Sequence, residues 1–183
     1  MEGLTLKEII IHWLQEINSL MDEAYENMKI ELNKVQQYAD CATGCKKMAI
    51  GTAIMKEDKG KMHKIYGANK VLFNECKERG CCRTEKYDEG SESYRNSGKC
   101  KAIHSEIDAL CKCAKDGIST KGAVAMVTRY PCEACARALI DAGIGIVIYG
   151  RKQEMSKETK HLFETARIPV IWIKDWEYED TER

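Results

Sequence analysis

Two short segments of the chain contain the residue types and the spacing of a catalytic metal site. H-S-E at residues 104–106 is followed by P-C-E-A-C at residues 131–135, so that His104 and Cys132 are 28 positions apart. His104, Cys132 and Cys135 would give a zinc ion three ligands and leave its fourth position open. An open position is typical of catalytic zinc sites, whereas structural sites usually close with four protein ligands.

A carboxylate beside such a site has a chemical use of its own. Zinc lowers the pKa of a water at the open position from about 15.7 to roughly 7, which makes a nucleophile at neutral pH. Glu106, two residues from His104, is the candidate general acid and base that would move the protons. The alternative is a structural zinc site closed by a fourth cysteine, in which Glu106 only caps a helix.

Both segments are predicted to open helices. Cys132 and Cys135 are three residues apart, so they share one helix face, and the free amides of a first turn favour their thiolate forms. This helix should follow Pro131 and end at Gly143. The first segment predicts a similar helix. Ser105 can cap its start and Gly117 ends it, and its apolar stripe consists of Ile107, Leu110 and Ala114.

Hydrophobic periodicity predicts an α/β fold. Helices are expected over residues 5–20, 22–40 and 157–166, and strands near 48–55, 62–67, 123–129, 145–149 and 169–173. The first two strands flank the polar turn K-E-D-K-G-K and should form an antiparallel hairpin, while the later strands alternate with helices and should pair in parallel. We therefore expect a five-stranded mixed sheet between helical layers, a three-layer α/β/α arrangement.

The chain divides into three predicted parts. Residues 1–36 form a helical extension, residues 37–175 the zinc-dependent domain, and residues 176–183 an acidic, frayed tail. The apolar stripe of the N-terminal helix, which includes Ile10, Trp13 and Ile17, must be covered either by the same chain or by another copy.

Composition narrows the classes of partner. The 183 residues are 44% hydrophobic and 32% charged, and 29 basic residues balance 29 acidic ones. Zero net charge favours a small-molecule substrate over nucleic acid or an anionic membrane. The N-terminus has no basic start, and no apolar run approaches the ~20 residues that span a bilayer, so we expect a cytoplasmic protein.

Ten cysteines are present, and in a reducing compartment they indicate metal binding or burial more than disulfides. Four of them fall in a polar stretch that is expected to be a long loop: Cys76, Cys81, Cys82 and Cys100. They would hold a second, structural zinc, or remain reduced and unligated. Four others, expected to be small buried hydrophobic residues, are Cys41, Cys45, Cys111 and Cys113.

Residues 38–173 resemble the deoxycytidylate (dCMP) deaminase branch of the cytidine deaminase superfamily. The H-x-E and P-C-x-x-C pattern is the signature of zinc-dependent nucleobase deaminases. Further matching segments are C-K-K at 45–47 before A-I-G-T-A-I at 49–54, G-A-N-K at 67–70, T-R-Y-P-C at 128–132 and A-G-I at 142–144. The G-C-C-R-T-E-K-Y-D-E-G segment before Lys99 resembles an insert of some bacterial and phage members.

The resemblance implies a zinc-dependent hydrolase that converts dCMP to dUMP and ammonia, assembled as a homo-oligomer. It implies that Asn69 hydrogen-bonds the nucleotide and that Tyr130 lines the pocket, although Asn69 is equally suited to a turn. Lys46 or Lys47 would contact the substrate phosphate, or form a solvated pair, since the family usually has arginine there. Activation by dCTP and inhibition by dTTP occur in the family and cannot be read from these residues.

Two other functions remain open. One is the same chemistry on another substrate, namely cytidine, guanine or an adenosine of tRNA. Zero net charge and the lack of a basic C-terminal cluster argue against tRNA. The other is a non-catalytic zinc module, which would have no need of Glu106.

Overall fold

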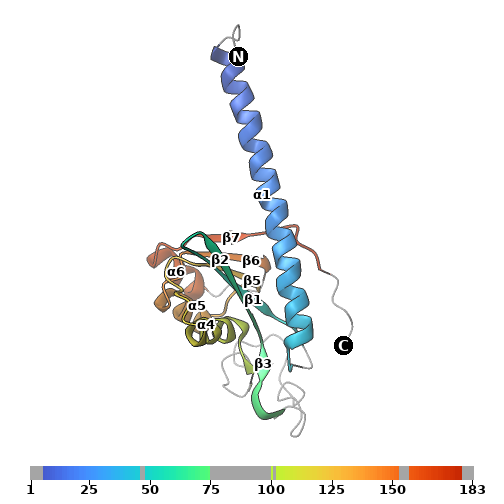
Figure 1. Ribbon diagram of the computed structural model, residues 1–183, viewed down its shortest axis with the longest axis vertical. Helices are drawn as coiled ribbons and strands as arrows, with labels where there is room; N and C mark the ends of the chain where they lie inside the picture. The colour runs from blue at the N-terminus through green and yellow to red at the C-terminus, as the bar shows by residue number, and fades with distance from the viewer. Residues whose placement is uncertain (1–5, 46–47, 75–99, 101, 153–156, 179–183) are drawn as a thin grey trace.

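A computed structural model describes residues 6–45, 48–74, 100, 102–152 and 157–178. One five-stranded sheet organises them, in the strand order β2-β1-β5-β6-β7 (Figure 1). The elements in chain order are α1 (Leu6–Ala42), β1 (Gly51–Asp58), β2 (Lys61–Ala68), β3 (Lys70–Val71), η1 (Leu72–Asn74), β4 (Ala102–Ile103), α4 (Ser105–Lys115), β5 (Val124–Arg129), α5 (Glu133–Asp141), β6 (Ile146–Arg151), α6 (Lys157–Thr165) and β7 (Val170–Trp172).

The sheet is mixed, as expected. β1 and β2 form an antiparallel hairpin, and Lys59 and Gly60 at its tip both have positive φ, of 50° and 78°. Two successive positive φ angles define the tight hairpin turn whose twist matches that of the strands. β1 also pairs antiparallel with β5, whereas β5, β6 and β7 are parallel. The predicted fold class and the five predicted strands are therefore confirmed.

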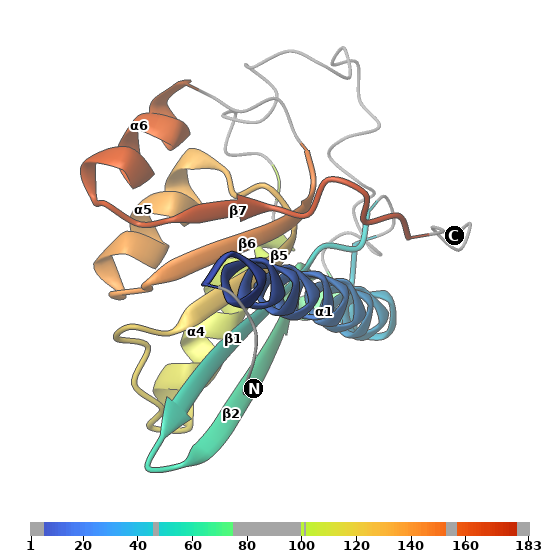
Figure 2. The same cartoon turned by 90° about the horizontal axis from the view of Figure 1, so that it is seen from above.

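Each face of the sheet is covered by helix. α4, α5 and α6 lie on one face and α1 crosses the other, as Figure 2 shows. Because successive strand residues point to opposite faces, neighbours divide between two cores. Ile54 and Val147 pack with α4, α5 and α6, while Ala53 and Ile148 pack with α1. This is the three-layer α/β/α arrangement.

α1 is one continuous helix of 37 residues, about 55 Å long, and not the two helical stretches expected. Its second half belongs to the core, where Leu32 and Val35 are fully buried. The helix thus crosses the predicted boundary between residues 36 and 37. Its first half extends beyond the sheet (Figure 1).

The chain after β7 folds back over α1. Trp176 is buried, and its indole N–H donates to Asn33 over 2.8 Å. The Tyr178 hydroxyl donates to Asp40 over 2.9 Å. The first residues assigned to a frayed tail therefore pack against the core, while residues 179–183 lie outside the described part of the chain.

The three shorter helices end in the same way. Gly117 and Gly143, the predicted terminators, have φ of 66° and 74° directly after α4 and α5. Arg167 does the same after α6, with φ of 57°. In each case the next residue donates its N–H back to the last turn, for example Ile144 to the Leu139 carbonyl over 3.0 Å. These are left-handed C-terminal caps, for which glycine is the preferred residue.

Some predictions about single residues are wrong. Of the four cysteines expected to be buried, Cys113 is buried, Cys45 is partly exposed, and Cys41 and Cys111 are exposed. On α4 the fully buried apolar side chains are Ala109 and Cys113, not the expected stripe.

Within the described residues, no helix has the length and apolar character needed to cross a bilayer.

Candidate active site

The two ligand segments meet at the N-termini of adjacent helices. His104 is the N-cap of α4 and Cys132 is the N-cap of α5, and both have extended backbones. His104 Nδ1 lies 3.5 Å from Cys132 Sγ and 3.3 Å from Cys135 Sγ. All three ligand atoms lie within 4.8 Å of one another. The structure therefore brings together the three side chains that the sequence predicted as ligands.

The spacing of these atoms fits a zinc ion. Zn–S bonds of about 2.3 Å and Zn–N bonds of about 2.0–2.1 Å at a tetrahedral angle place sulfur and nitrogen roughly 3.5 Å apart. The observed separations, 3.3 and 3.5 Å, agree with this value. His104 lies at the exposed edge of the group, whereas Cys135 is buried.

The site favours the thiolate form of Cys132. The pKa of Cys132 falls to about 4, mainly because Cys135 donates a hydrogen bond to it and also because His104 does. The same contact with Cys132 raises the pKa of His104 to about 9. The pKa of Cys135 rises because Cys135 is the donor to Cys132 and is itself buried. These three groups share protons as a cluster, and a soft divalent cation satisfies such a cluster by replacing the protons.

Glu106 lies in the first turn of α4 and is 4% exposed. Burial raises the pKa of its carboxyl group, and its charge contributes to the raised pKa of Cys135. The Ser105 hydroxyl donates a 3.1 Å hydrogen bond to Glu106 Oε2. A buried carboxyl beside a metal-binding group can hold and release a proton near neutral pH.

Ser105 does not cap α4 as predicted. It is the first residue of the helix, His104 occupies the cap position, and no side chain caps the helix. The Ser105 hydroxyl instead lies 2.8 Å from the Thr52 hydroxyl of β1, and both side chains are fully buried. The pair connects the carboxylate of Glu106 to the central sheet.

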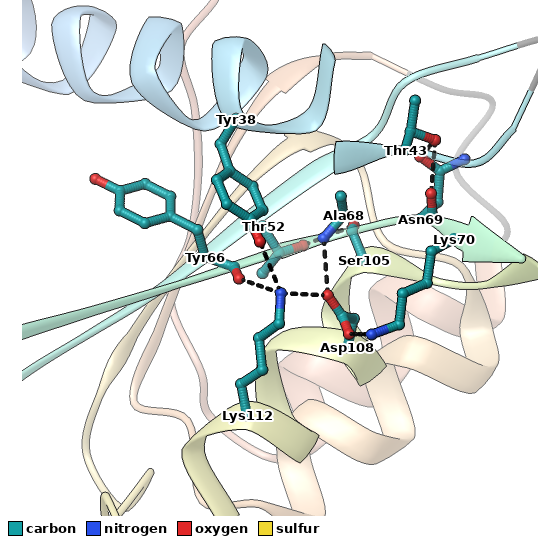
Figure 3. A network of polar contacts seen from close by, with 10 residues as sticks. All are labelled: Tyr38, Thr43, Thr52, Tyr66, Ala68, Asn69, Lys70, Ser105, Asp108 and Lys112. Atoms are coloured by element: carbon teal, nitrogen blue, oxygen red, sulfur yellow. Dashed lines mark hydrogen bonds and ion pairs between the residues drawn. The ribbon is translucent and has the colours of Figure 1, made fainter. Parts of the chain in front are cut away.

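A charged network that sequence reasoning missed fixes the next turn of α4 (Figure 3). The nearly buried carboxylate of Asp108 forms ion pairs with Lys70 and, over 2.7 Å, with Lys112. It also accepts the backbone N–H of Ala68 over 3.2 Å. Lys112 donates in turn to the Tyr66 carbonyl over 2.9 Å. The only local signal was the i,i+4 spacing of Asp108 and Lys112, which by itself predicts a surface pair.

Asn69 forms hydrogen bonds with the chain segment that precedes β1. Its Oδ1 accepts from the Ile50 N–H over 2.8 Å and from the Thr43 hydroxyl over 2.9 Å, and its Nδ2 donates to the Met48 carbonyl over 2.9 Å. The side chain is 6% exposed. These bonds give Asn69 a structural role, and the described residues account for one of its two amide protons.

Tyr130 immediately precedes the cysteine segment and is 4% exposed. Its ring packs edge-on against Tyr149, with centroids 4.8 Å apart, and its N–H donates to the Arg151 carbonyl over 3.1 Å. The packing holds the strand end that leads into α5.

Several candidate residues are not described. Lys46 and Lys47 lie outside the described residues, as do Cys76, Cys81 and Cys82. Cys100 is described and exposed. The proposed phosphate contact and the second zinc site stay predictions.

Comparison with known proteins identifies the class to which this fold and site belong. The sequence profile of the MafB19-like deaminase family matches residues 26–179, which is most of the chain. The chain belongs to this family, and its resemblance to the dCMP deaminases is confirmed.

Two curated relatives illustrate that resemblance. ComE operon protein 2 of Bacillus subtilis (strain 168) is 29% identical over 130 residues, which are 71% of this chain and 62% of that protein. The deoxycytidylate deaminase of enterobacteria phage T2 is 36% identical over 79 residues, 43% of this chain and 42% of the phage protein. The matches thus span less than two thirds of either relative.

Solved structures share the fold. The dCMP deaminase of cyanophage S-TIM5, crystallised with dCMP and dUMP, superposes with a TM-score of 0.57 and 18% identity, covering 80% of this chain and 96% of that one. A diaminohydroxyphosphoribosylaminopyrimidine deaminase/reductase from Thermotoga maritima gives a TM-score of 0.54 and 18% identity over 81% of this chain and 37% of that one. At this identity the likeness concerns the fold.

Proposed function

We propose that this deaminase uses zinc to hydrolyse the exocyclic amine of a cytosine nucleotide, with dCMP converted to dUMP and ammonia. One observation carries the proposal. His104, Cys132 and Cys135 converge with their ligand atoms within 4.8 Å, and the buried Glu106 follows one of them in the first turn of α4.

The ligand set supports zinc over harder cations, because two thiolates and an imidazole are its preferred donors. Bound at these ligands, zinc would polarise a water molecule so that it attacks near neutral pH. The N-termini of α4 and α5, with their free backbone amides, both lie at the group of His104, Cys132 and Cys135. The partial positive charge of these helix ends favours the negative charge of the thiolates.

Glu106 moves the protons in this proposal. It accepts one proton from the attacking water as the C4–O bond forms and delivers it to ring N3. It then takes the second proton from the hydroxyl now on C4 and delivers it to the amine, so that ammonia leaves as the C4–N bond breaks and the C4 carbonyl forms. Burial raises the pKa of this carboxyl group, which helps it to hold a proton between the two transfers. The Ser105 hydroxyl holds the carboxylate in one orientation through Oε2.

The substrate assignment rests on the phage relatives, whose names give deoxycytidylate as their substrate. Under this proposal Asn69 uses its second amide proton for the nucleotide, and Tyr130, just before the cysteine segment, lines the pocket. The enzyme would work in the cytoplasm as a homo-oligomer and supply dUMP to deoxynucleotide synthesis.

Ammonia release tests the proposal. Zinc-loaded protein is given cytosine, adenine and guanine as bases, nucleosides and monophosphates, beside the Glu106→Gln variant, which keeps the volume of the side chain. Turnover of dCMP above the others, lost in the variant at unchanged zinc content, supports the proposal. Turnover of a different compound rejects the substrate and keeps the chemistry. Zinc binding without any turnover favours the non-catalytic module.

A further inference from the structure

The first half of α1 presents an apolar face that the described part of the chain leaves uncovered. Every residue from 10 to 24 is exposed. The large apolar side chains in this segment are 45–66% exposed, namely Ile10, Ile11, Trp13, Leu14, Ile17, Leu20 and Met21. Figure 1 shows this half of the helix extending away from the sheet. Monomeric proteins rarely expose a continuous apolar surface of this size.

This face continues one that already forms a core. From Tyr25 onward the same side of α1 packs on the sheet, through Met28, Leu32 and Val35. The helix therefore has one apolar face along its length, and the residues that the structure describes cover this face in the second half only. We name the uncovered part, residues 10–24, the overhang.

The spacing within the overhang is that of a two-helix seam. Ile10, Trp13, Ile17, Leu20 and Ala24 alternate intervals of three and four residues. Such alternation keeps a stripe facing one partner helix in a coiled coil. From residue 10 to residue 20 the intervals are three, four and three, which read the same in both directions.

We propose that the overhang pairs antiparallel with the overhang of a second copy of this chain, about a twofold axis near Gln15. A twofold interface requires one patch to complement itself, and an interval pattern that is its own reverse does so. In this register Ile10 faces Leu20 and Trp13 faces Ile17, in both directions. In this register Lys7 lies level with Glu23 of the other copy along the helix axis.

The area that the pair would bury and the charge of the overhang both favour a second copy of the chain over a lipid surface. Seven large side chains that are half exposed amount to a few hundred Å² per copy, or on the order of 1,000 Å² for the pair, the lower end of specific interfaces. A lipid surface fits less well. Residues 6–24 contain one lysine and four acidic residues, whereas helices that lie on membranes are rich in lysine and arginine.

A matched pair of variants tests the interface. Ile17 and Ile30 are on the same helix and are 51% and 52% exposed, but they point about 140° apart around the axis. In sedimentation velocity of the full chain, Ile17→Glu should halve the particle mass and raise the dissociation constant by about 100-fold. Ile30→Glu should behave as wild type. Circular dichroism should show both variants folded, because both side chains are exposed.

The direction of pairing has its own readout. A photo-crosslinking amino acid at position 7, in a mixture of isotopically light and heavy chains, should link to residues near Glu23 of the other copy. Links between the two copies of position 7 would reject the antiparallel arrangement. Equal masses for wild type and Ile17→Glu would reject the interface altogether. The interface would also be rejected if the wild-type protein were monomeric and bound lipid vesicles, and if Ile17→Glu abolished that binding. None of these readouts requires deaminase activity.

Discussion

Gly67 determines how closely the site helix approaches the sheet. A methyl group at Gly67 of β2 would lie 2.3 Å from the carbonyl oxygen of Ser105 and 2.6 Å from the backbone nitrogen of Ala109. Both are backbone atoms of α4, so no side-chain rotation relieves the contact. Since ordinary contact begins near 3.4 Å, Gly67→Ala must push α4 away by about 1.1 Å, the difference between 3.4 and 2.3 Å.

That displacement moves His104 and Glu106 relative to the cysteines on α5. A misplacement of about 1 Å typically costs about 100-fold in rate. We therefore expect Gly67→Ala to lower kcat/KM by about 100-fold and to weaken zinc binding. Overpacking should also lower the free energy of unfolding by about 1–3 kcal/mol. The measurements are ammonia release, competition for zinc with a chromophoric chelator, and chemical denaturation.

Gly51 provides the matched control. It lies at the same end of the hairpin, one residue pair away, and a methyl group there would lie 2.4 Å from the carbonyl oxygen of Val35 on α1. Gly51→Ala should lose similar stability while zinc affinity and rate stay near wild type. If the two variants lose rate and zinc affinity equally, the contact between Gly67 and α4 does not position the site, and the reasoning fails.

Three further outcomes are expected. Ser105→Ala should lower kcat about tenfold at unchanged zinc affinity, because the hydroxyl orients Glu106; an unchanged kcat in steady-state assays would remove that role. Arg167→Gly should raise the free energy of unfolding by about 1 kcal/mol, because Arg167 has φ of 57° where glycine is unstrained; a lower thermal midpoint would contradict this. Burial by itself would raise the pKa of Asp108, but its contacts with Lys112, Lys70 and the Ala68 N–H together lower it below its usual 3.8. Its stabilisation is complete above that value and is lost as the pH falls through the folded pKa. Asp108→Asn should therefore cost about 2 kcal/mol at neutral pH and flatten the acid limb of the stability profile below about pH 4; an unaltered limb would mean that Asp108 does not carry it.

Local signals in the sequence are enough to predict the helix ends and the group formed by His104, Cys132 and Cys135. Gly117 and Gly143 terminate α4 and α5 as expected, because a left-handed cap depends on the residue itself and on the turn before it. The hairpin turn at Lys59 and Gly60 is local in the same sense. The types and the spacing of His104, Cys132 and Cys135 predict a metal-binding group without any tertiary information.

The tertiary structure decided which face of α4 is buried and what surrounds Glu106. The sequence favoured an apolar stripe, but the buried face includes Glu106 and Asp108. The partners of these two residues come from far along the chain. Thr52 is connected to Glu106 through the Ser105 hydroxyl, and Lys70 forms an ion pair with Asp108 directly. Periodicity counts apolar residues and cannot anticipate polar groups whose partners lie 38 to 53 positions away in the sequence.

α1 shows the same division. Its sequence determines a long amphipathic helix, since no glycine or proline interrupts residues 6–42. Only the packed structure decides that residues from Tyr25 onward cover the sheet while the overhang does not. The reason is geometric. A helix of about 55 Å is longer than the sheet it crosses, and the residues beyond the sheet retain an apolar face that no other described residue covers.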